Sequence, residues 1–578
     1  MLNLYPRPQF ERTDWINLNG EWNFSFDDTK KGETEKWYLN FPMKQKIMVP
    51  YNYETILSGI NDQTRHDVIW YNKKITIHKD LEYNNIINFD GVDYETKLWV
   101  NGNFVGLHKG GYAAFSFDIT EFVVDGENDI TVRVEDSMSC EQPRGKQRWK
   151  KENFGCWYVQ TTGIWKSVWM ESVHKCYIKN VKMTPDIDKG EIHILAKVSG
   201  RREDVLTELQ CEISLDGNFV RKVTAQVKEE YVDITIKVAS EDEPWSVAIW
   251  SPHSPRLYDI QFSILEDGVN KDSVKSYFGM RKISIRGNQI LLNNLPIYQK
   301  LILDQGYWEE SHLTPPSEEA IITDIDLILE AGYNGLRKHQ KTEDRRFLYW
   351  CDKKGLLVWS EMASQYSFTD DGMKVFTNEW MEIVEEFYNH PSIITWTPFN
   401  ESWGIERIFS DKKQQKFTEA IYHLTKAFDS MRPVIVNDGW EHTVSDIITL
   451  HDYVERGEEF LLRYENKDEI LHNVIPFNLS RYAFAEGYEY KGQPVIISEY
   501  GGIALTNNSG WGYGEQVKSE DDLIKRFDSI TSAIKKLNYV CGYCYTQLTD
   551  VQQEINGLYT MKREPKVNIE AIKKINNK

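Results

Sequence analysis

The spacing of hydrophobic and polar positions changes along the chain. Up to about residue 172, short segments alternate apolar and polar residues between turn signals, as in Lys97–Val100 before Asn101-Gly102. Such alternation is typical of strands with one buried face, and Asn-Gly is a strong hairpin signal. The pattern predicts a jelly-roll β-sandwich over residues 1–172.

Alternation continues from residue 173 to 285, for example in Glu191–Val198 and Val232–Val238. About 110 residues of this pattern is the size of an immunoglobulin-like β-sandwich. We therefore expect a second all-β domain over residues 173–285. No low-complexity linker separates it from its neighbours, so the parts are expected to pack against one another.

From residue 286 to 578 the period changes, because apolar strands now alternate with amphipathic helical patterns such as Glu318 to Glu330 and Asp521 to Lys536. Strands alternating with helices over this length predict a (β/α)8 TIM barrel. The expected barrel strands lie near 298–303, 334–339, 356–361, 393–400, 433–437, 446–452, 494–498 and 541–547.

Two of these strands end on a glutamate. The fourth rises through Ile393–Phe399 to Asn400-Glu401, and the seventh rises through Pro494–Ser498 to Glu499. The carboxyl ends of barrel strands open on one face, and strands four and seven lie nearly opposite each other there. Glu401 and Glu499 are thus a candidate catalytic pair, against the alternative that each is a capping or salt-bridge carboxylate.

The other strand ends are also polar or aromatic, which predicts one pocket with many convergent groups. Glu361, after strand three, is either part of that pocket or a partner of a cation. The further candidates for substrate binding are Asp304, Arg337, His339, Trp403, Trp440, Tyr453, Tyr545 and Gln547, together with Asn400.

Two opposed carboxyl groups suit glycosidic-bond cleavage, in which one protonates the leaving oxygen and the other attacks or activates water. A separation of about 5 Å would indicate a retaining mechanism and one of roughly 6.5–9.5 Å an inverting one, which the sequence leaves open. Trp396 and Trp403 flank Glu401 and would raise its pKa, as an acid needs. Arg337 could keep Glu499 ionised as a nucleophile.

Composition narrows the partners. Aromatic residues make up 13% of the chain, which suits flat faces for sugar rings, although β-sandwich cores also favour them. A net charge of −20 argues against nucleic acid or an anionic membrane as partner. Met1–Pro8 lacks the apolar region of a signal peptide and no window resembles a membrane span, so a cytoplasmic location is expected.

The seven cysteines are scattered, which fits reduced thiols. Cys541 and Cys544 form a C-x-x-C within an apolar run that reads as a strand. A separation of three sends their side chains to opposite faces, so we interpret them as structural rather than as a redox or zinc pair.

The chain resembles glycoside hydrolase family 2, the family of β-galactosidases, β-glucuronidases and β-mannosidases, over nearly its full length. The resemblance implies a retaining mechanism with Glu401 as acid/base, Glu499 as nucleophile and no cofactor. It also implies that Arg337, His339, Asn400 and Tyr453 line the site of the terminal sugar, that the first domain is similar to sugar-binding domains, and that a homo-oligomer is possible. The matching motifs are Leu18–Trp22, Gly163–Trp169, Trp250-Ser251-Pro252, Pro255–Tyr258, Phe278–Lys282, Asn400-Glu401 and Ser498–Gly502.

Two departures from the family limit the choice of substrate. Family β-glucuronidases carry Asn-x-Lys after strand eight to hold the uronate, whereas this chain reads Glu554-Ile555-Asn556-Gly557-Leu558, without the lysine. Large β-galactosidases of the family use a His and a Glu after strand three to hold magnesium, but Glu361–Ser364 contains no His. We therefore expect no required metal.

Arg337, Lys338 and Lys341 place three cations beside the pocket, and these could bind a uronic acid. Alternatively, Lys338 and Lys341 point away and pair with nearby acids such as Glu343, Asp344 or Glu361, while Arg337 only supports Glu499. The leading prediction is an exo-acting retaining β-galactosidase, and the second is a β-galacturonidase or β-glucuronidase. A non-catalytic carbohydrate-binding protein, with the loop 149–158 over the pocket rim, is the third.

Overall fold

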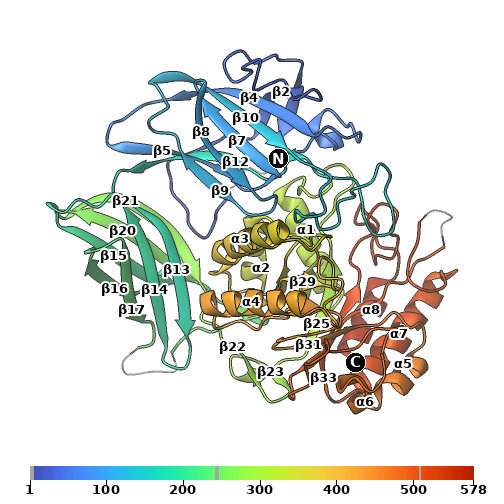
Figure 1. Ribbon diagram of the computed structural model, residues 1–578. Coiled ribbons are helices and arrows are strands. Elements are labelled where there is room, and N and C mark those ends of the chain that lie inside the picture. Colours follow the sequence, from blue (N-terminus) through green and yellow to red (C-terminus); the bar gives the residue numbers. More distant parts are fainter. Residues whose placement is uncertain (1–4, 241–245, 507–509) are drawn as a thin grey trace.

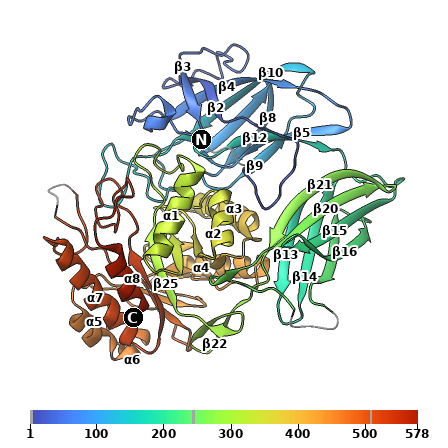
Figure 2. The ribbon, with the colours of Figure 1, turned by 180° about the vertical axis from the view of Figure 1, so that it is seen from behind.

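The computed structural model describes residues 5–240, 246–506 and 510–578. Figures 1 and 2 show two β-sandwiches packed against different sides of a barrel surrounded by helices. The predicted combination of jelly-roll sandwich, immunoglobulin-like sandwich and TIM barrel is confirmed. In the described part of the chain, no helix is both long and apolar enough to cross a membrane.

The N-terminal sandwich consists of two antiparallel sheets around one apolar core. Trp22 and Tyr71 from one sheet and Ile87 and Met170 from the other are buried in that core. The smaller sheet has the order β1 (Trp15–Asn17), β12 (Val168–His174), β5 (Tyr83–Phe89) and β9 (Phe115–Asp118). The larger has the order β3 (Gln45–Val49), β2 (Gly20–Phe26), β4 (Val68–Ile77), β10 (Gly126–Glu135), β7 (Glu95–Val100) and β8 (Asn103–Lys109).

The middle sandwich shows why alternation predicts its strands. In β14 (Glu191–Ser199) every second residue is buried, from Ile192 to Val198, because successive side chains point to opposite faces. Its sheets are β13 (Tyr177–Asp186), β14 and β17 (Tyr231–Lys237), facing β16 (Asn218–Gln226), β15 (Thr207–Leu215), β20 (Tyr258–Glu266) and β21 (Val269–Phe278).

The barrel is built from parallel strands. One sheet has the order β28 (Ile393–Thr397), β27 (Leu357–Glu361), β26 (Gly335–Lys338), β25 (Gln299–Asp304), β33 (Val540–Thr546), β32 (Val495–Gly501) and β31 (Ile448–His451). The short pair β29 (Phe399–Asn400) and β30 (Asn437–Asp438) bridges its two ends, and His451 N donates to Gly439 O at 3.2 Å beside β30. The fifth strand, β30, is therefore shorter than the expected strand 433–437 and begins only at the last residue of that range.

Helices cover the outside of the barrel. They are α1 (Glu318–Glu330), α2 (Arg345–Lys354), α3 (Asp370–Phe387), α4 (Lys412–Phe428), α5 (Gly457–Tyr464), α6 (Lys467–Leu471), α7 (Glu520–Lys536) and α8 (Ile569–Asn577). The helix predicted at 318–330 is confirmed without change, and that at 521–536 begins one residue earlier. Ser519 starts α7 because its side chain accepts the N–H of Asp522.

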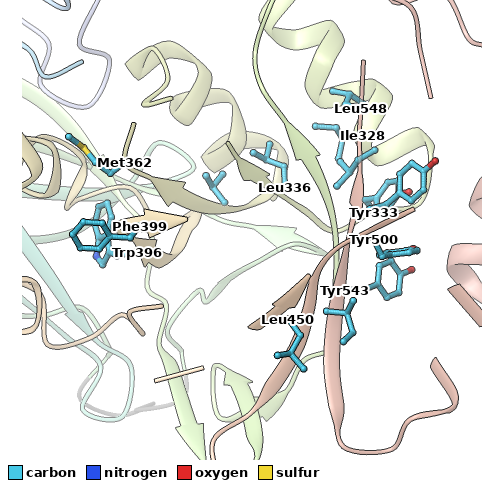
Figure 3. Close-up of a cluster of buried hydrophobic side chains, with 14 of the residues drawn as sticks. Ile328, Tyr333, Leu336, Met362, Trp396, Phe399, Leu450, Tyr500, Tyr543 and Leu548 are labelled. Atoms are coloured by element: carbon cyan, nitrogen blue, oxygen red, sulfur yellow. The ribbon is translucent and has the colours of Figure 1, made fainter. Parts of the chain in front are cut away.

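Two apolar layers hold the barrel. Between strands and helices lies a large cluster that includes Trp396, Phe399 and Tyr500, drawn in Figure 3. Inside the barrel, residues such as Trp359 and Ile496 pack with Ile290 of a small sheet formed by β22 (Ile283–Arg286), β23 (Gln289–Leu292) and β24 (Leu295–Pro296). The strands are thus buried on both faces, which explains their continuous apolar runs.

A loop of the N-terminal sandwich lies against loops of the barrel, where the two segments meet in both views of the ribbon (Figures 1 and 2). Asn153 Nδ2 donates to Gln552 Oε1 at 2.6 Å, and Trp511 Nε1 donates to Gly155 O at 3.0 Å. Gln553 Nε2 donates to Trp157 O at 2.9 Å. These bonds fix the segment around residues 149–158 beside the barrel mouth.

Arg12 joins the two sandwiches through buried ion pairs. Its guanidinium lies 2.9 Å from Asp272 of β21 and 3.1 Å from Glu171 of β12. Arg12→Met would leave both carboxylates buried without this partner, so we expect a loss of about 3 kcal/mol or more in unfolding free energy, measured by urea denaturation. Lys74→Met, which breaks an exposed pair with Glu127, is the control and should leave the midpoint unchanged. Equal behaviour of the two variants would contradict the ion-pair argument.

Candidate active site

Glu401 and Glu499 face each other at the carboxyl end of the barrel. A carboxylate oxygen of Glu401, a ring nitrogen of His451 and a carboxylate oxygen of Glu499 all lie within 4.8 Å of one another. Glu401 directly follows β29, its side chain 17% exposed, and Glu499 lies in β32, its side chain 5% exposed. The two glutamates expected to oppose each other are therefore close enough to act on one bond.

The backbone turns sharply at Glu401. Glu401 and Ser402 have φ angles of 51° and 60°, in the left-handed region that non-glycine residues rarely occupy. Glu401 N donates to Asp438 O at 2.8 Å, and Ser402 N donates to Asn437 Oδ1 at 3.0 Å. These bonds to β30 hold a conformation that costs about 1–3 kcal/mol per residue, as is common at functional sites.

Gly501 and Gly502 are required after Glu499. Gly501 has a φ of 86°, and a Cβ there would lie 2.3 Å from the ring of Tyr545. A Cβ on Gly502, at φ 56°, would lie 2.3 Å from the ring of Tyr513. The glycine pair thus lets the loop carrying Tyr513 pack directly over the end of β32.

Arg337 lies behind the two glutamates, fully buried. Its Nη1 donates to Glu499 Oε1 at 2.7 Å and lies 2.8 Å from Asp438 Oδ2. Its Nε donates to Glu361 Oε2 at 2.6 Å, and its Nη2 donates to Asn400 Oδ1 at 2.6 Å. The guanidinium is therefore saturated by protein groups, and Arg337 supports the glutamates from behind.

Glu499 is held in its ionised form. Burial alone would raise the pKa of this carboxyl, but the charges of His451 and Arg337 hold its pKa below the ordinary value. Tyr453 also donates its hydroxyl to Glu499 Oε2. Glu499 is therefore a buried carboxylate that accepts hydrogen bonds from Arg337 and Tyr453.

His451 is an imidazolium between three carboxylates. Its Nδ1 lies 2.8 Å from Glu401 Oε1 and 3.5 Å from Glu499 Oε2, and its Nε2 lies 3.0 Å from Asp438 Oδ2. Burial lowers the pKa of His451, but Glu499 and Asp438 outweigh it and raise the pKa to about 10. By spacing, Glu401, His451 and Glu499 could also hold a metal ion, for which His451 would first have to lose this proton.

Two buried donors remain open near the glutamates. Among the described residues, Asn400 Nδ2 and Trp440 Nε1 have no hydrogen-bond partner. Asn400 is fixed by Arg337 through its oxygen, and the Trp440 ring lies 5.6 Å from that of His451. Buried donors without partners are unfavourable, so both are suited to a ligand with hydroxyl groups.

His339 and Trp403 lie on the same side of the mouth, with ring centroids 6.2 Å apart. His339 Nδ1 is 3.0 Å from Glu361 Oε1, and burial keeps the pKa of His339 well below its ordinary value, so the ring is neutral. Glu361 also accepts from Gln340 Nε2 at 2.9 Å. Glu361 is thus a partner of Arg337 rather than a group at the mouth.

Two aromatic residues expected at the site point the other way. Tyr545 packs 4.9 Å from Phe527 of α7 and 5.5 Å from Tyr500, in the layer between strands and helices. Strand alternation instead turns the next residue, Thr546, to the mouth, where its Oγ1 lies 3.1 Å from Tyr453.

The expectation that Trp396 flanks Glu401 is also wrong. Its Nε1 donates to Asp429 Oδ2 at 2.8 Å, and its ring lies 5.9 Å from that of Trp380 in α3. In Figure 3, Trp396 lies beside Phe399 in the buried apolar cluster. Sequence adjacency in a strand does not bring side chains together, because successive residues face opposite sides.

Asp304, Lys338 and Lys341 form a separate buried ion cluster. Lys338 Nζ lies 2.5 Å from Asp304 Oδ2 and 2.9 Å from Glu343 Oε2, and Lys341 Nζ lies 2.9 Å from the same Glu343 oxygen. Together with the saturated Arg337, this confirms that the three cations pair internally. They do not form a binding site for a uronate.

A polar network joins the N-terminal loop to strand eight. Tyr158 donates its hydroxyl to Glu554, and Gln547 Nε2 donates to Glu554 Oε1 at 3.1 Å and to Asn556 Oδ1 at 2.6 Å. Gln547, predicted at the site, therefore lies within this network, and Gln305 Nε2 donates to its oxygen at 2.8 Å.

Tyr513 and Lys146 were missed by the sequence argument. The Tyr513 ring stacks on Tyr453 with centroids 3.4 Å apart, and Lys146 Nζ lies 4.9 Å from the Trp403 ring. Neither follows a barrel strand directly, so the strand-end rule could not find them. Asp438 and His451 do stand at strand ends, and that rule could have included both.

The (β/α)8 barrel thus presents two nearby carboxylates at its mouth, one of them held ionised by a buried arginine, and glycoside hydrolases use a carboxylate pair of this kind. The protein belongs to glycosyl hydrolases family 2. Its residues 16–172 match the family's sugar binding domain and 283–578 its TIM barrel domain, and residues 176–281 match a further model described as glycosyl hydrolases family 2.

Proteins with different names are similar to this chain in sequence. A putative β-glucuronidase of Formosa agariphila is 26% identical over 450 residues, covering 76% of this chain and 52% of that protein. A β-galactosidase of Thermoanaerobacter pseudethanolicus is 26% identical over 463 residues, covering 76% and 57%. The chain thus spans about half the length of these curated relatives.

A solved β-glucuronidase from an uncultured Clostridium sp. has the same fold, with a TM-score of 0.78 and 21% identity over 100% of both chains.

The charge of His451 predicts a pH dependence of stability. Because its folded pKa of about 10 lies above the ordinary 6.5, the stabilisation is complete below pH 6.5 and is lost as pH rises towards 10. The unfolding free energy of the wild type relative to His451→Gln should therefore fall by at least about 2 kcal/mol over this range, measured by urea denaturation at each pH. A difference that stays constant would mean that His451 is neutral in the folded protein.

Proposed function

We propose that this protein is an exo-acting β-glycosidase that hydrolyses terminal β-linked sugars by double displacement with retention. The supporting observation is the carboxylate pair: oxygen atoms of Glu401 and Glu499 lie within 4.8 Å of each other. Retaining enzymes have carboxyl groups about 5–5.5 Å apart, whereas inverting enzymes leave roughly 6.5–9.5 Å for a water molecule. The short distance therefore favours direct attack on the sugar.

In the first step Glu499 attacks the anomeric carbon while Glu401 protonates the leaving oxygen. Arg337 and Tyr453 donate to Glu499, which keeps it ionised and orients it. His451 lies 2.8 Å from Glu401 and stabilises the carboxylate that forms when Glu401 delivers its proton. The glycosyl bond to Glu499 then forms as the leaving group departs.

In the second step Glu401 takes a proton from water, which attacks the same anomeric carbon and releases Glu499. The open Asn400 Nδ2 is suited to the sugar 2-hydroxyl, next to the reacting carbon. Trp440 Nε1 is the second open donor and is suited to another hydroxyl of the terminal sugar. Contacts of this kind strengthen in the transition state and contribute several kcal/mol to catalysis.

Two terminal sugars are candidates, galactose and a uronic acid. The chain carries Glu554–Leu558, without a lysine, where family β-glucuronidases are expected to hold the uronate, so that contact is missing for a uronic acid. The relatives named β-glucuronidase and β-galactosidase support both. The ion pairs of Lys338 and Lys341 remove one argument for a uronide, so a uronate would need another cation.

Glu499→Ala should lower kcat/KM for an aryl β-glycoside by at least about a thousandfold, because no nucleophile replaces it. Glu401→Ala should lower it far less for a nitrophenyl leaving group, which needs little protonation, and azide should restore turnover of that variant as a β-glycosyl azide. Glu361→Gln removes a buried carboxylate charge behind Arg337 and tests whether the loss of any such charge lowers kcat/KM as much as Glu499→Ala does. Wild-type rates in Glu499→Ala would exclude it as the nucleophile.

A panel of aryl β-glycosides, read as kcat/KM, should identify the terminal sugar. We expect turnover of the galactoside, the galacturonide or the glucuronide to exceed that of the mannoside and glucoside by at least about tenfold, the scale of one well-placed polar contact. Saturable binding of these sugars with no hydrolysis of any member would instead favour a carbohydrate-binding protein.

A further inference from the structure

Lys146 is a buried lysine at the barrel mouth that comes from the N-terminal sandwich. It lies in the loop after β10, and only 6% of its surface is exposed. Among residues 5–240, 246–506 and 510–578, no carboxylate oxygen lies close enough to Lys146 Nζ, at 4.0 Å or less, to form an ion pair. Lys338 and Lys341, by contrast, are buried with carboxylates at 2.9 Å or less.

The surrounding structure fixes Lys146 beside the two glutamates. Its Nζ lies 4.9 Å from the ring of Trp403, two residues after Glu401, and its backbone O accepts from Tyr158 N at 2.8 Å. The hydroxyl of the same Tyr158 donates to Glu554. The segment is thus held between the acid side of the mouth and the loop after strand eight.

Lys146 keeps its charge in this position. Burial lowers its pKa, but the nearby Cys156, Glu554, Glu499 and Glu401 outweigh burial and raise the pKa above its ordinary value. The thiol of Cys156 is a hydrogen-bond partner of this ammonium, but a thiol is a weak acceptor and replaces little of the hydration that a buried charge loses. An anion brought by a ligand would supply the missing partner.

We propose that Lys146 binds the carboxylate of the terminal sugar, and hence that the enzyme prefers β-linked uronic acids. This inference rests on the proposed glycosidase function. Arg337, Lys338 and Lys341 are each paired with carboxylates, whereas Lys146 has a thiol neighbour and, among the described residues, no ion-paired carboxylate. A charged hydrogen bond to a carboxylate is also stronger than one to the hydroxyl of a neutral sugar.

The position explains how a uronate could enter a mouth that already holds Glu401, Glu499 and Glu554. Repulsion from these carboxylates would exclude a second acid unless a cation lay on the ligand side. The carboxylate of Glu554 is already engaged by Tyr158, Gln547 and Asn556. Lys146 therefore has its charge available for the substrate.

The test compares wild type, Lys146→Met, Lys146→Arg and Lys151→Met. Lys151 is exposed on the same loop and serves as the matched loss of charge. We expect Lys146→Met to lower kcat/KM for aryl β-galacturonide or β-glucuronide by at least about tenfold more than for aryl β-galactoside. Lys146→Arg should restore part of the uronide activity, and Lys151→Met should change neither.

Calorimetric titration with free galacturonate, glucuronate and galactose separates binding from chemistry. Lys146→Met should lose affinity for the uronates and keep any affinity for galactose. If this is seen but no glycoside is hydrolysed, only the proposed hydrolysis is contradicted. Equal losses on acidic and neutral sugars, or a wild type that hydrolyses galactosides but neither binds nor hydrolyses uronates, would overturn the role of Lys146. Melting temperatures identify a variant that fails to fold, and Lys146→Arg then provides the comparison.

Discussion

One buried guanidinium sets the geometry of the barrel mouth. Arg337 of β26 contacts Glu361 of β27, Asn400 of β29, Asp438 of β30 and Glu499 of β32. A fully buried charge is tolerated only with complete pairing, and the planar fork of arginine accepts partners in few directions. The ends of five strands are therefore fixed relative to one another, and both glutamates inherit their positions from that arrangement.

The two glutamates have different surroundings, which is what a division of roles requires. Glu499 is enclosed and receives donors from Arg337 and Tyr453, so its negative charge is stabilised. Glu401 sits on a strained turn, is more exposed, and touches the imidazolium of His451. The same neighbours hold one carboxyl as a carboxylate and leave the other next to the space where a leaving group would lie. In the proposed mechanism, environment rather than residue type separates the roles of the two glutamates.

The sequence was sufficient for the architecture because strand period, helix period and strand ends are local signals. The same reasoning placed Glu401 and Glu499 opposite each other at the barrel mouth, where they lie, since each ends an apolar run. It failed for Trp396 and Tyr545, because a shift of one residue in a strand turns a side chain from the mouth to the helix layer. It also could not find Lys146, whose position depends on packing between residues far apart in the chain.

The most direct test of the central claim is to trap the glycosyl-enzyme. In a 2-deoxy-2-fluoro aryl glycoside of the preferred sugar, the fluorine slows both steps by destabilising their oxocarbenium-like transition states. A good aryl leaving group keeps the first step faster than the second, so the covalent intermediate accumulates. Peptide mass spectrometry should then find one fluorosugar on Glu499, and no label in Glu499→Ala. A label on another residue, or steady hydrolysis with inversion at the anomeric carbon and no label, would contradict the account.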